Sequence, residues 1–186
     1  MNDKRLSKLL SFVLRHRPEA IGLELNPQGW APLDTLLAQL KAQGHAVNLT
    51  QIERVVANND KQRFKLDLIH RRIRANQGHS IPVDLALDEQ SPPPILYHGT
   101  AQRFLSSILE AGLLKRQRQH VHLSQQYETA IKVGQRHGKV VILLVKAQEM
   151  QAAGYRFFLA ENGVWLTDWV PPHFLEVEKK ASKRSN

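Results

Sequence analysis

The sequence predicts an α+β protein built from two units. Its 186 residues are enough for two small domains. Apolar residues at helical spacing fill the first half, whereas short strand-like runs and helices are mixed in the second half. A proline-rich stretch at 88–94 separates the halves as an extended, semi-rigid connector. We therefore expect a first unit at 1–88, a second unit at 89–178 and a basic tail at 179–186.

The first half predicts three helices followed by a small hairpin. Apolar residues at helical spacing indicate helices over 3–17 and 33–40. Pro18 ends the first helix, because a proline disfavours helical backbone in the residue before it. A capping box at 50–53 (TQIE) begins the third helix. The strands of the hairpin are expected at 63–66 and 73–75. This order of elements favours a winged-helix unit.

The second half predicts several strands and two helices. The sequence Asn162-Gly163 is a strong hairpin signal, although the loop around it is longer than two residues. The longest apolar run, Val140–Val145, is far shorter than the roughly 18 residues of a membrane span. The expected strands are 95–97, 121–123, 140–145, 155–159 and 164–166, and the expected helices are 104–112 and 127–134.

The charge of the chain points to a polyanionic partner. Lys and Arg total 26 against 17 acidic residues, which gives a formal net charge of +9. Both halves carry an excess of bases, and nucleic acid is the usual partner of such a protein. The chain has 0 cysteines, which excludes disulfides, thiolate zinc sites and cysteine nucleophiles. No secretory signal is seen at the N-terminus, so we expect a cytoplasmic protein.

Two basic clusters in the first half are candidates for binding phosphate. Arg15 and His16 end the first predicted helix, where cations also interact favourably with the helix dipole. Arg is suited to phosphate because its planar guanidinium binds two oxygens at once. Arg74 lies on a predicted strand that leads into a loop of donors and small residues at 75–80 (ANQGHS). A solvated helix end and a solvated strand are the alternatives.

The second half of the chain contains histidines that are candidate binding residues. His98-Gly99-Thr100 directly follows a predicted strand, where a glycine lets a flat ligand approach the backbone and pair with its N–H and C=O. A carboxamide such as nicotinamide has matching groups. His120 and His122 share one face of their strand if Val121 and Leu123 face the core. We expect no zinc site, because two such histidines lack a third ligand nearby. No P-loop or Rossmann fingerprint is present.

Taken together, these segments resemble the KptA-type RNA 2′-phosphotransferases. The resemblance extends from Ser7 to about Val177 and rests on six ordered segments at compatible spacing. They are 7–20 (SKLLSFVLRHRPEA), 29–30 (GW), 73–80 (IRANQGHS), 96–100 (LYHGT), 121–124 (VHLS) and 161–166 (ENGVWL).

The resemblance implies a winged-helix lobe joined to a lobe of the ADP-ribosyltransferase fold. It also implies a reaction with NAD+ as co-substrate and without a metal. The 2′-phosphate of an RNA attacks the nicotinamide ribose and expels nicotinamide, which forms RNA-2′-phospho-ADP-ribose. The ribose 2″-hydroxyl then attacks the phosphorus. The products are 2′-hydroxyl RNA and ADP-ribose 1″,2″-cyclic phosphate. An internal 2′-phosphate of this kind arises at a tRNA splice junction.

The resemblance also assigns residues. The family's catalytic tetrad corresponds to Arg15, His16, Arg74 and Arg118, where Arg118 is chosen over Arg116 by counting back from His122. In the NAD-binding lobe the family's residues correspond to His98, Gly99, Thr100, His122, Ser124 and Val164. Many ADP-ribosyltransferases have a glutamate near the position of Val164. A valine cannot activate an acceptor by hydrogen bonding, so transfer to a protein side chain is disfavoured.

Two other functions remain open at this point. His98-Gly99-Thr100 and His122-Leu123-Ser124 both fit the His-x-Thr/Ser pattern of two-histidine RNA 2′,3′-cyclic phosphodiesterases. A winged helix can also bind nucleic acid without catalysis, although 51–59 offers only Arg54 as a base. For the preferred function we expect a monomer that acts on RNA bearing a 2′-phosphate and on NAD+, away from membranes.

Overall fold

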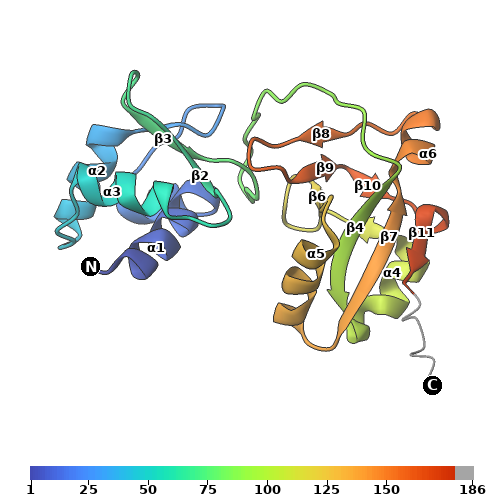
Figure 1. Ribbon diagram of the computed structural model, residues 1–186. Helices are drawn as coiled ribbons and strands as arrows, with labels where there is room; N and C mark the ends of the chain where they lie inside the picture. The colour runs from blue at the N-terminus through green and yellow to red at the C-terminus, as the bar shows by residue number, and fades with distance from the viewer. Residues whose placement is uncertain (179–186) are drawn as a thin grey trace. The chain divides into compact units, whose positions relative to one another are not determined.

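The computed structural model describes residues 1–178, and the expected basic tail at 179–186 lies outside the described residues. The described chain is a mixed α/β protein with six α-helices and four small antiparallel sheets (Figure 1), in agreement with the predicted class. It divides into two compact units. Among the described residues, the first unit comprises 1–87 together with 117–119 and 160–162, and the second comprises 88–116, 120–159 and 163–178.

The first unit contains the three predicted helices and the predicted hairpin. Its elements are α1 (Asp3–Arg15), a 3₁₀ turn (Pro18–Ile21), β1 (Ala31–Pro32), α2 (Leu33–Ala42), α3 (Leu49–Ala57), β2 (Phe64–Asp67) and β3 (Arg72–Ala75). The strand β3 pairs with both β1 and β2. One apolar core, with Leu6, Leu36 and Ile73 fully buried, joins α1, α2 and the sheet. The amphipathic pattern of each helix therefore determines how this unit packs.

Two details of the first unit differ from expectation. The helix α3 begins one residue before Thr50, because the side chain of Asn48 is its N-cap and accepts a hydrogen bond from the backbone N of Gln51 at 2.9 Å. Asparagine is among the strongest N-cap residues, so it displaces the predicted capping box. The helix α1 ends at Arg15 rather than residue 17, because Pro18 begins a separate 3₁₀ turn.

The second unit is built around a long antiparallel pair. Its strands are β4 (Ile95–Ala101), β5 (Leu113–Leu114), β6 (Val121–Leu123), β7 (Val140–Lys146), β8 (Phe158–Leu159), β9 (Trp165–Thr167), β10 (Trp169–Val170) and β11 (Leu175–Val177). Its helices are α4 (Leu105–Ala111), α5 (Tyr127–Gly134) and α6 (Ala147–Ala152), with 3₁₀ turns at Gln102–Phe104, Gln135–His137 and Pro172–Phe174. The strand β7 lies between β4 and β11, and β9 lies between β6 and β8.

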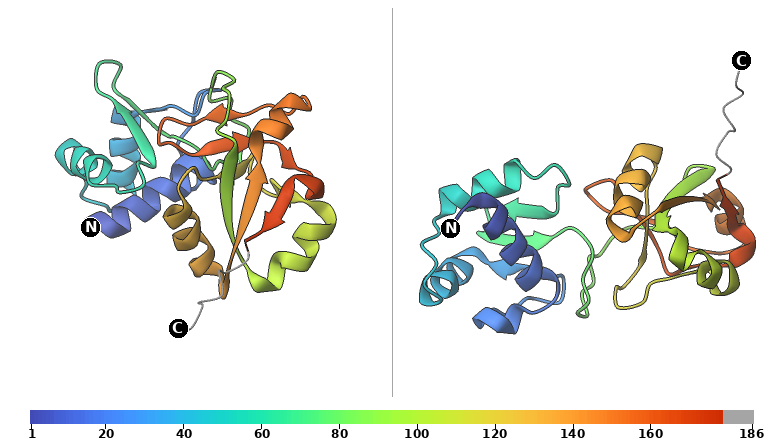
Figure 2. Two further views of the ribbon diagram at one scale, coloured as in Figure 1. Left: turned by 45° about the vertical axis from the view of Figure 1, so that its right-hand side comes forward. Right: turned by 90° about the horizontal axis from the view of Figure 1, so that it is seen from below.

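The helices of the second unit cover its central sheet. The helix α5 packs against β4 and β7, and α4 lies on the other side of the sheet in both views (Figure 2). The predicted hairpin is present, since Leu159 pairs with Trp165 across the loop that contains Asn162. Val121 and Leu123 are buried, which places His122 on the opposite face of β6, whereas His120 precedes the strand. A single bridge between Tyr97 and Ser124 joins β4 to β6.

Candidate functional site

The first candidate group lies at the C-terminal end of α1. The side chain of Arg15 donates from Nη1 to Ser11 Oγ at 3.2 Å and from Nη2 to Gln77 Oε1 at 3.4 Å. Its Nε is buried and has no hydrogen-bond partner. The backbone leaves the helix at His16, which caps α1. Arg15 is therefore held by two long hydrogen bonds, and its buried Nε–H donor is unused.

The loop that follows β3 returns to the end of α1. The backbone N of Ser80 donates to the carbonyl O of Arg15 at 2.9 Å, and Ser80 Oγ lies 2.9 Å from Nδ1 of His16. The loop thereby fixes the ring of His16 and, through Gln77, the guanidinium of Arg15. This explains why the segment 75–80 contains donors and small residues.

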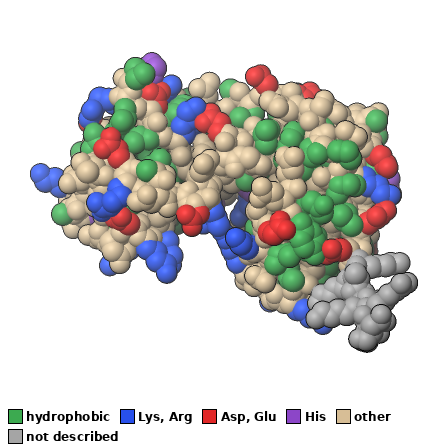
Figure 3. All heavy atoms as spheres, viewed as in Figure 1, with side chains coloured by type: hydrophobic (Ala, Val, Ile, Leu, Met, Phe, Trp, Pro, Cys, Tyr) green, Lys and Arg blue, Asp and Glu red, His purple; other side chains and the backbone are tan. Residues whose placement is uncertain are grey.

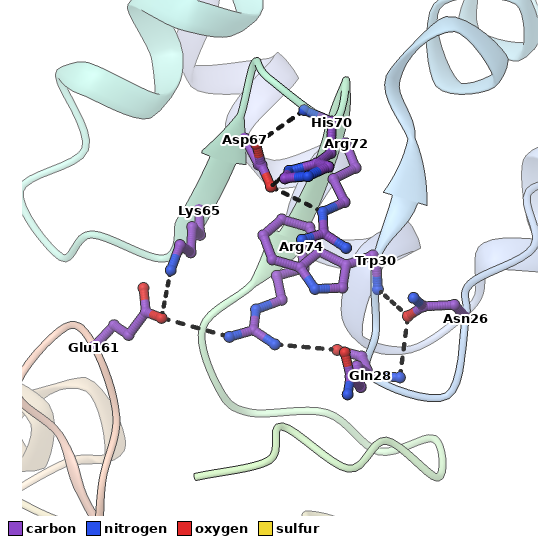
Figure 4. Close-up of polar contacts among 9 residues, drawn as sticks. All are labelled: Asn26, Gln28, Trp30, Lys65, Asp67, His70, Arg72, Arg74 and Glu161. Carbon is purple, nitrogen blue, oxygen red and sulfur yellow. Dashed lines mark hydrogen bonds and ion pairs between the residues drawn. The ribbon is translucent and has the colours of Figure 1, made fainter.

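Arg74 is held in a different way, on β3 (Figure 4). Its side chain is 7% exposed, and its guanidinium lies 4.6 Å from the centre of the Trp30 ring. Arg72 lies 4.3 Å from the same ring, so the indole is between the two guanidinium groups. Nη1 of Arg74 donates to the carbonyl O of Gln28 at 3.5 Å, and Nη2 lies 3.5 Å from Oε1 of Glu161. Such contacts fix the plane of the guanidinium.

Two short segments from the second half of the chain belong to the first unit. Glu161 accepts from Lys65 Nζ at 2.6 Å and also pairs with Arg74. Arg118 lies in the segment 117–119, which is anchored where Gln119 Nε2 donates to the carbonyl O of Ile81 at 2.8 Å. The first unit is therefore not continuous in sequence, and both segments contribute charged side chains to it.

The charges of predicted tetrad residues affect the pKa values of Arg15 and His16. Burial is the main cause that lowers the pKa of Arg15 to about 10, and the nearby charges of Arg63 and Arg118 lower it further. Burial, Arg15 and Arg118 lower the pKa of His16. The charge of Arg118 thus acts on both Arg15 and His16.

Arg74 joins this group through His79, a residue to which the sequence assigned no role. His79 is 1% exposed, and its Nε2 is buried without a hydrogen-bond partner. Burial first, and then Arg15, Arg74 and His16, lower its pKa to about 4. His79 is therefore a neutral imidazole among cations. We call Arg15, His16, Arg74 and Arg118 the cation cluster.

The second candidate group lies on β4, and here one expectation is wrong. His98-Gly99-Thr100 does not follow a strand but lies inside β4, which continues to Ala101. A Cβ atom on Gly99 would lie 1.7 Å from the carbonyl O of Ala130 on α5. A side chain is excluded there by the packing of a helix, rather than by the approach of a ligand.

The backbone of Gly99 nevertheless has a suitable orientation for a ligand. Tyr97 exchanges two backbone hydrogen bonds of 2.8 Å with Ser124, on the side of β6. Alternate residues of an antiparallel strand direct their N–H and C=O groups to the same side. Gly99 therefore directs both groups toward the β6 edge, beyond the single bridge where β4 and β6 part. A carboxamide needs this pair of groups.

The histidines of this group are linked to each other. Nδ1 of His98 lies 3.0 Å from the carbonyl O of His122, so Nδ1 carries the proton and Nε2 is the acceptor nitrogen. Leu123 pairs with Trp165, and one further step in this register sets Ser124 opposite Val164. Thr100 is 5% exposed. The contacts thus link His98 to His122 and place Ser124 beside β4, while β6 pairs with β9, the strand that follows Val164.

Three residues at the first group were not assigned roles from sequence. His79 and Gln77 lie in the loop 75–80, whose donor-rich composition was the available signal. Glu161 lies 87 positions from Arg74, and no local pattern links them. No set of three or more His, Cys, Asp or Glu side chains suited to a metal ion occurs within residues 1–178. Among those residues no helix is long and apolar enough to cross a membrane.

A surface pocket elsewhere in the first unit contains none of the predicted site residues. It lies beside α2 and is lined by residues that include Leu37, Lys41 and His45. It shares no residue with the cation cluster, so we do not connect it with the chemistry of the site.

Comparisons with known proteins agree with the resemblance seen in the sequence. The family model described as "RNA 2′-phosphotransferase, Tpt1 / KptA family" matches residues 1–169. A protein of Acaryochloris marina named "Probable RNA 2′-phosphotransferase" is 57% identical over 94% of this chain and 97% of its own length. Proteins of the same name are 55% identical in Pseudomonas fluorescens, over 91% of this chain and 94% of their own, and 53% identical in Agrobacterium fabrum, over 97% of both.

Proposed function

The chain belongs to the RNA 2′-phosphotransferase, Tpt1 / KptA family of enzymes, and we propose that it removes an internal 2′-phosphate from RNA by transferring it to NAD+. One observation carries this proposal. The charged groups that act on Arg15 are the cations Arg63 and Arg118, and the buried Nε of Arg15 has no partner. A phosphomonoester, with a charge of about −1.5 to −2, supplies the missing counter-charge.

In this proposal the cation cluster positions the phosphate. The guanidinium groups of Arg15, Arg74 and Arg118 hold its oxygens, so that it is oriented for attack on the acceptor carbon. In the second step they stabilise the charge that spreads over the phosphoryl oxygens. Burial and the charges of Arg15 and Arg118 lower the pKa of His16, and its ring donates a hydrogen bond to the phosphate.

The second group fits the nicotinamide end of NAD+. The N–H and C=O of Gly99 face an edge where a carboxamide can pair with both. Nε2 of His98 accepts a hydrogen bond from a ribose hydroxyl, and Thr100, His122, Ser124 and Val164 complete the surroundings. When bound, NAD+ supplies an activated ribose carbon as the phosphate acceptor. Val164 offers no carboxylate, which suits a nucleophile that is already an anion.

The proposal also covers the two lobes and the RNA. Three helices and a β2–β3 hairpin support a winged-helix lobe for the RNA 2′-phosphate. The parting of β4 from β6 beside Gly99 supports an ADP-ribosyltransferase-like lobe for NAD+. RNA with a splice-junction phosphate, as in tRNA processing, is the substrate type we propose.

The two other functions lack a supporting observation. The hydrogen bond between the two histidines joins Nδ1 of His98 to the backbone carbonyl of His122, and the two-histidine function leaves Arg15 and Arg74, each with a buried Nε, without a role. Arg54, the one base on α3, is held by Asp3 at 2.7 Å. A recognition helix without an available base is a poor reader of duplex DNA.

Product analysis tests the proposal directly. An oligoribonucleotide with one internal 2′-phosphate is incubated with the protein, with and without NAD+, and the products are identified by mass spectrometry. We expect 2′-hydroxyl RNA, nicotinamide and ADP-ribose 1″,2″-cyclic phosphate only when NAD+ is present. Loss of the phosphate without NAD+ would refute the proposal.

A further inference from the structure

The outer face of α1 has an unusual composition beside the cation cluster. The inner face buries Leu6, Leu10, Val13 and Leu14 in the core. Residues four apart lie on one side of a helix, at intervals of about 6 Å along its axis. Positions 4, 8 and 12 of α1 therefore follow one side of the helix and hold Lys4, Lys8 and Phe12, and His16 is the C-cap at the end of the helix. We call Lys4, Lys8 and Phe12 the α1 stripe, which leads directly to the cluster.

Phe12 is an exposed aromatic side chain that does not belong to the core of the first unit. Its side chain is 43% exposed, although it lies one helical turn before Arg15 and His16. No other large apolar side chain of α1 is exposed to this degree in the described structure. One aromatic ring surrounded by cations is not an apolar protein interface, which needs several apolar contacts.

The charge of the stripe is available to a partner. Lys4 and Lys8 are exposed and take part in no ion pair within residues 1–178. The only acid of α1, Asp3, is bound by Arg54 and Gln51. In the space-filling view, Lys and Arg side chains stand out along the lower edge of the first unit, where α1 lies (Figure 3). The stripe is therefore a positive surface with one aromatic ring.

We propose that the α1 stripe binds the RNA segment next to the 2′-phosphate, with Phe12 stacking on a base and Lys4 and Lys8 contacting backbone phosphates. This inference rests on the proposed function. Cations combined with an exposed aromatic ring are the combination that binds single-stranded nucleic acid, because every base has a face on which a ring can stack. Binding of this kind does not depend strongly on sequence.

Kinetics with two substrates of different length distinguish RNA binding by the α1 stripe from a role of Phe12 in catalysis. One is an oligoribonucleotide with an internal 2′-phosphate and several nucleotides on each side, and the other is a dinucleotide with the same phosphate. We expect Phe12→Ala to raise KM for the long substrate about tenfold, because stacking on an aromatic ring is worth about 1–3 kcal/mol per base. The kinetics of the dinucleotide should stay within about twofold of the wild type, because the inference places the stacked base beyond the two nucleotides that flank the 2′-phosphate.

Matched variants identify the cause. Leu109→Ala removes a side chain of α4 that is 44% exposed, and it should change neither substrate. Phe12→Trp should keep a low KM, whereas Phe12→Leu should behave as Phe12→Ala because leucine cannot stack. Lys8→Gln should reduce the slope of log affinity against log salt by about 0.7 for the long RNA.

Failure of the inference about the α1 stripe can be distinguished from failure of the proposed function. An equal loss on both substrates would mean that Phe12 supports the cation cluster, and an unchanged KM on the long RNA would mean that no base stacks there; either result overturns the inference. If the wild type releases no phosphate with NAD+, the proposed function fails. Binding of the long RNA, followed by fluorescence anisotropy, still tests the stripe in that case, and equal affinity of wild type and Phe12→Ala would overturn it.

Discussion

Arg15 and Arg74 are both members of the proposed phosphate-binding group, but different kinds of partners hold them. Arg74 has a carboxylate, a carbonyl and an aromatic face around it. Arg15 has two polar uncharged partners, and the charges that act on it are both positive. Arg74 therefore has an acidic partner within the fold, although its Nε, like that of Arg15, is buried without a hydrogen-bond partner. No acidic group is among the charges that act on Arg15, so an anion that binds there supplies its counter-charge. One side of the cluster supplies orientation and the other supplies electrostatic attraction.

The strongest test of this difference is Arg15→Met. We expect kcat/KM for the RNA to fall by roughly 10²–10³-fold, as when a donor to a developing anion is removed. The same variant should be more stable by about 1 kcal/mol, because it removes a buried cation without a counter-charge, and the melting temperature should rise by about 2–4 °C. Activity assays and thermal unfolding measure the two effects. A lower melting temperature would contradict the contrast with Arg74.

Arg74→Ala should give the opposite sign in stability. We expect activity to fall about 10²-fold and the fold to lose about 1 kcal/mol, because the contact with Trp30 is lost. Circular dichroism should show that the fold persists. Arg72→Ala is the matched control, since Arg72 covers the other face of Trp30, and it should lose similar stability but keep most of its activity. Near-full activity of Arg74→Ala would remove Arg74 from the cluster's function.

Burial and the charges of both arginines lower the pKa of His79, so the stability of the fold should depend on pH through this residue. Its pKa is lowered to about 4, so the unfolded chain binds a proton at this residue before the folded chain does. The stability that the neutral form of His79 contributes to the fold is present above pH 6.5 and is lost as the pH falls through about 4. The loss amounts to something on the order of 3 kcal/mol. His79→Gln should remove that part of the pH dependence of urea unfolding, and the exposed His137→Gln should not. Equal pH profiles for both variants would contradict the assignment.

The smallest effect is expected at Glu161, the carboxylate that compensates Arg74. Glu161→Gln removes a negative charge that competes with RNA for Lys65 and Arg74, so KM for the RNA should fall about twofold to fivefold. The pair with Lys65 is about two-fifths exposed on each side, which keeps the effect small. Glu176→Gln, which breaks an exposed pair with Lys146 in the second unit, is the control. A rise in KM would show that Glu161 positions Arg74 instead of competing with RNA.

Much of the fold follows from local patterns. The apolar periodicity of α1 and the alternation in β2 and β6 are set by residues close in sequence, and these elements occur where they were expected. The errors are also local. The N-cap of α3 is Asn48 rather than Thr50. The strand β4 extends through Gly99 because it pairs with β7 over this length. Pairing between distant strands is not visible in a short window of sequence.

The candidate site was harder to predict than the fold. The resemblance supplied Arg15 and Arg74, but it said nothing of the surroundings that make them differ. Arg118 and Glu161 reach the first unit in short segments from the second half of the chain. The burial that lowers the pKa of His79 likewise depends on packing between distant segments. Such properties belong to the tertiary structure, and no pattern at fixed spacing encodes them.

The close approach of α5 to β4 affects how mutational scans of this enzyme are interpreted. Glycine is present on both sides of this contact, because a Cβ on Gly99 would overlap Ala130 and a Cβ on Gly134 would lie 2.4 Å from Val140 Cγ2. Even alanine at Gly99 must push the helix away from the sheet. Variants at this position will therefore score as inactive through reduced yield of folded protein. Loss of activity on substitution of Gly99 therefore reports the packing of α5 against β4. Only assays corrected for the amount of folded protein will report what the backbone of Gly99 binds.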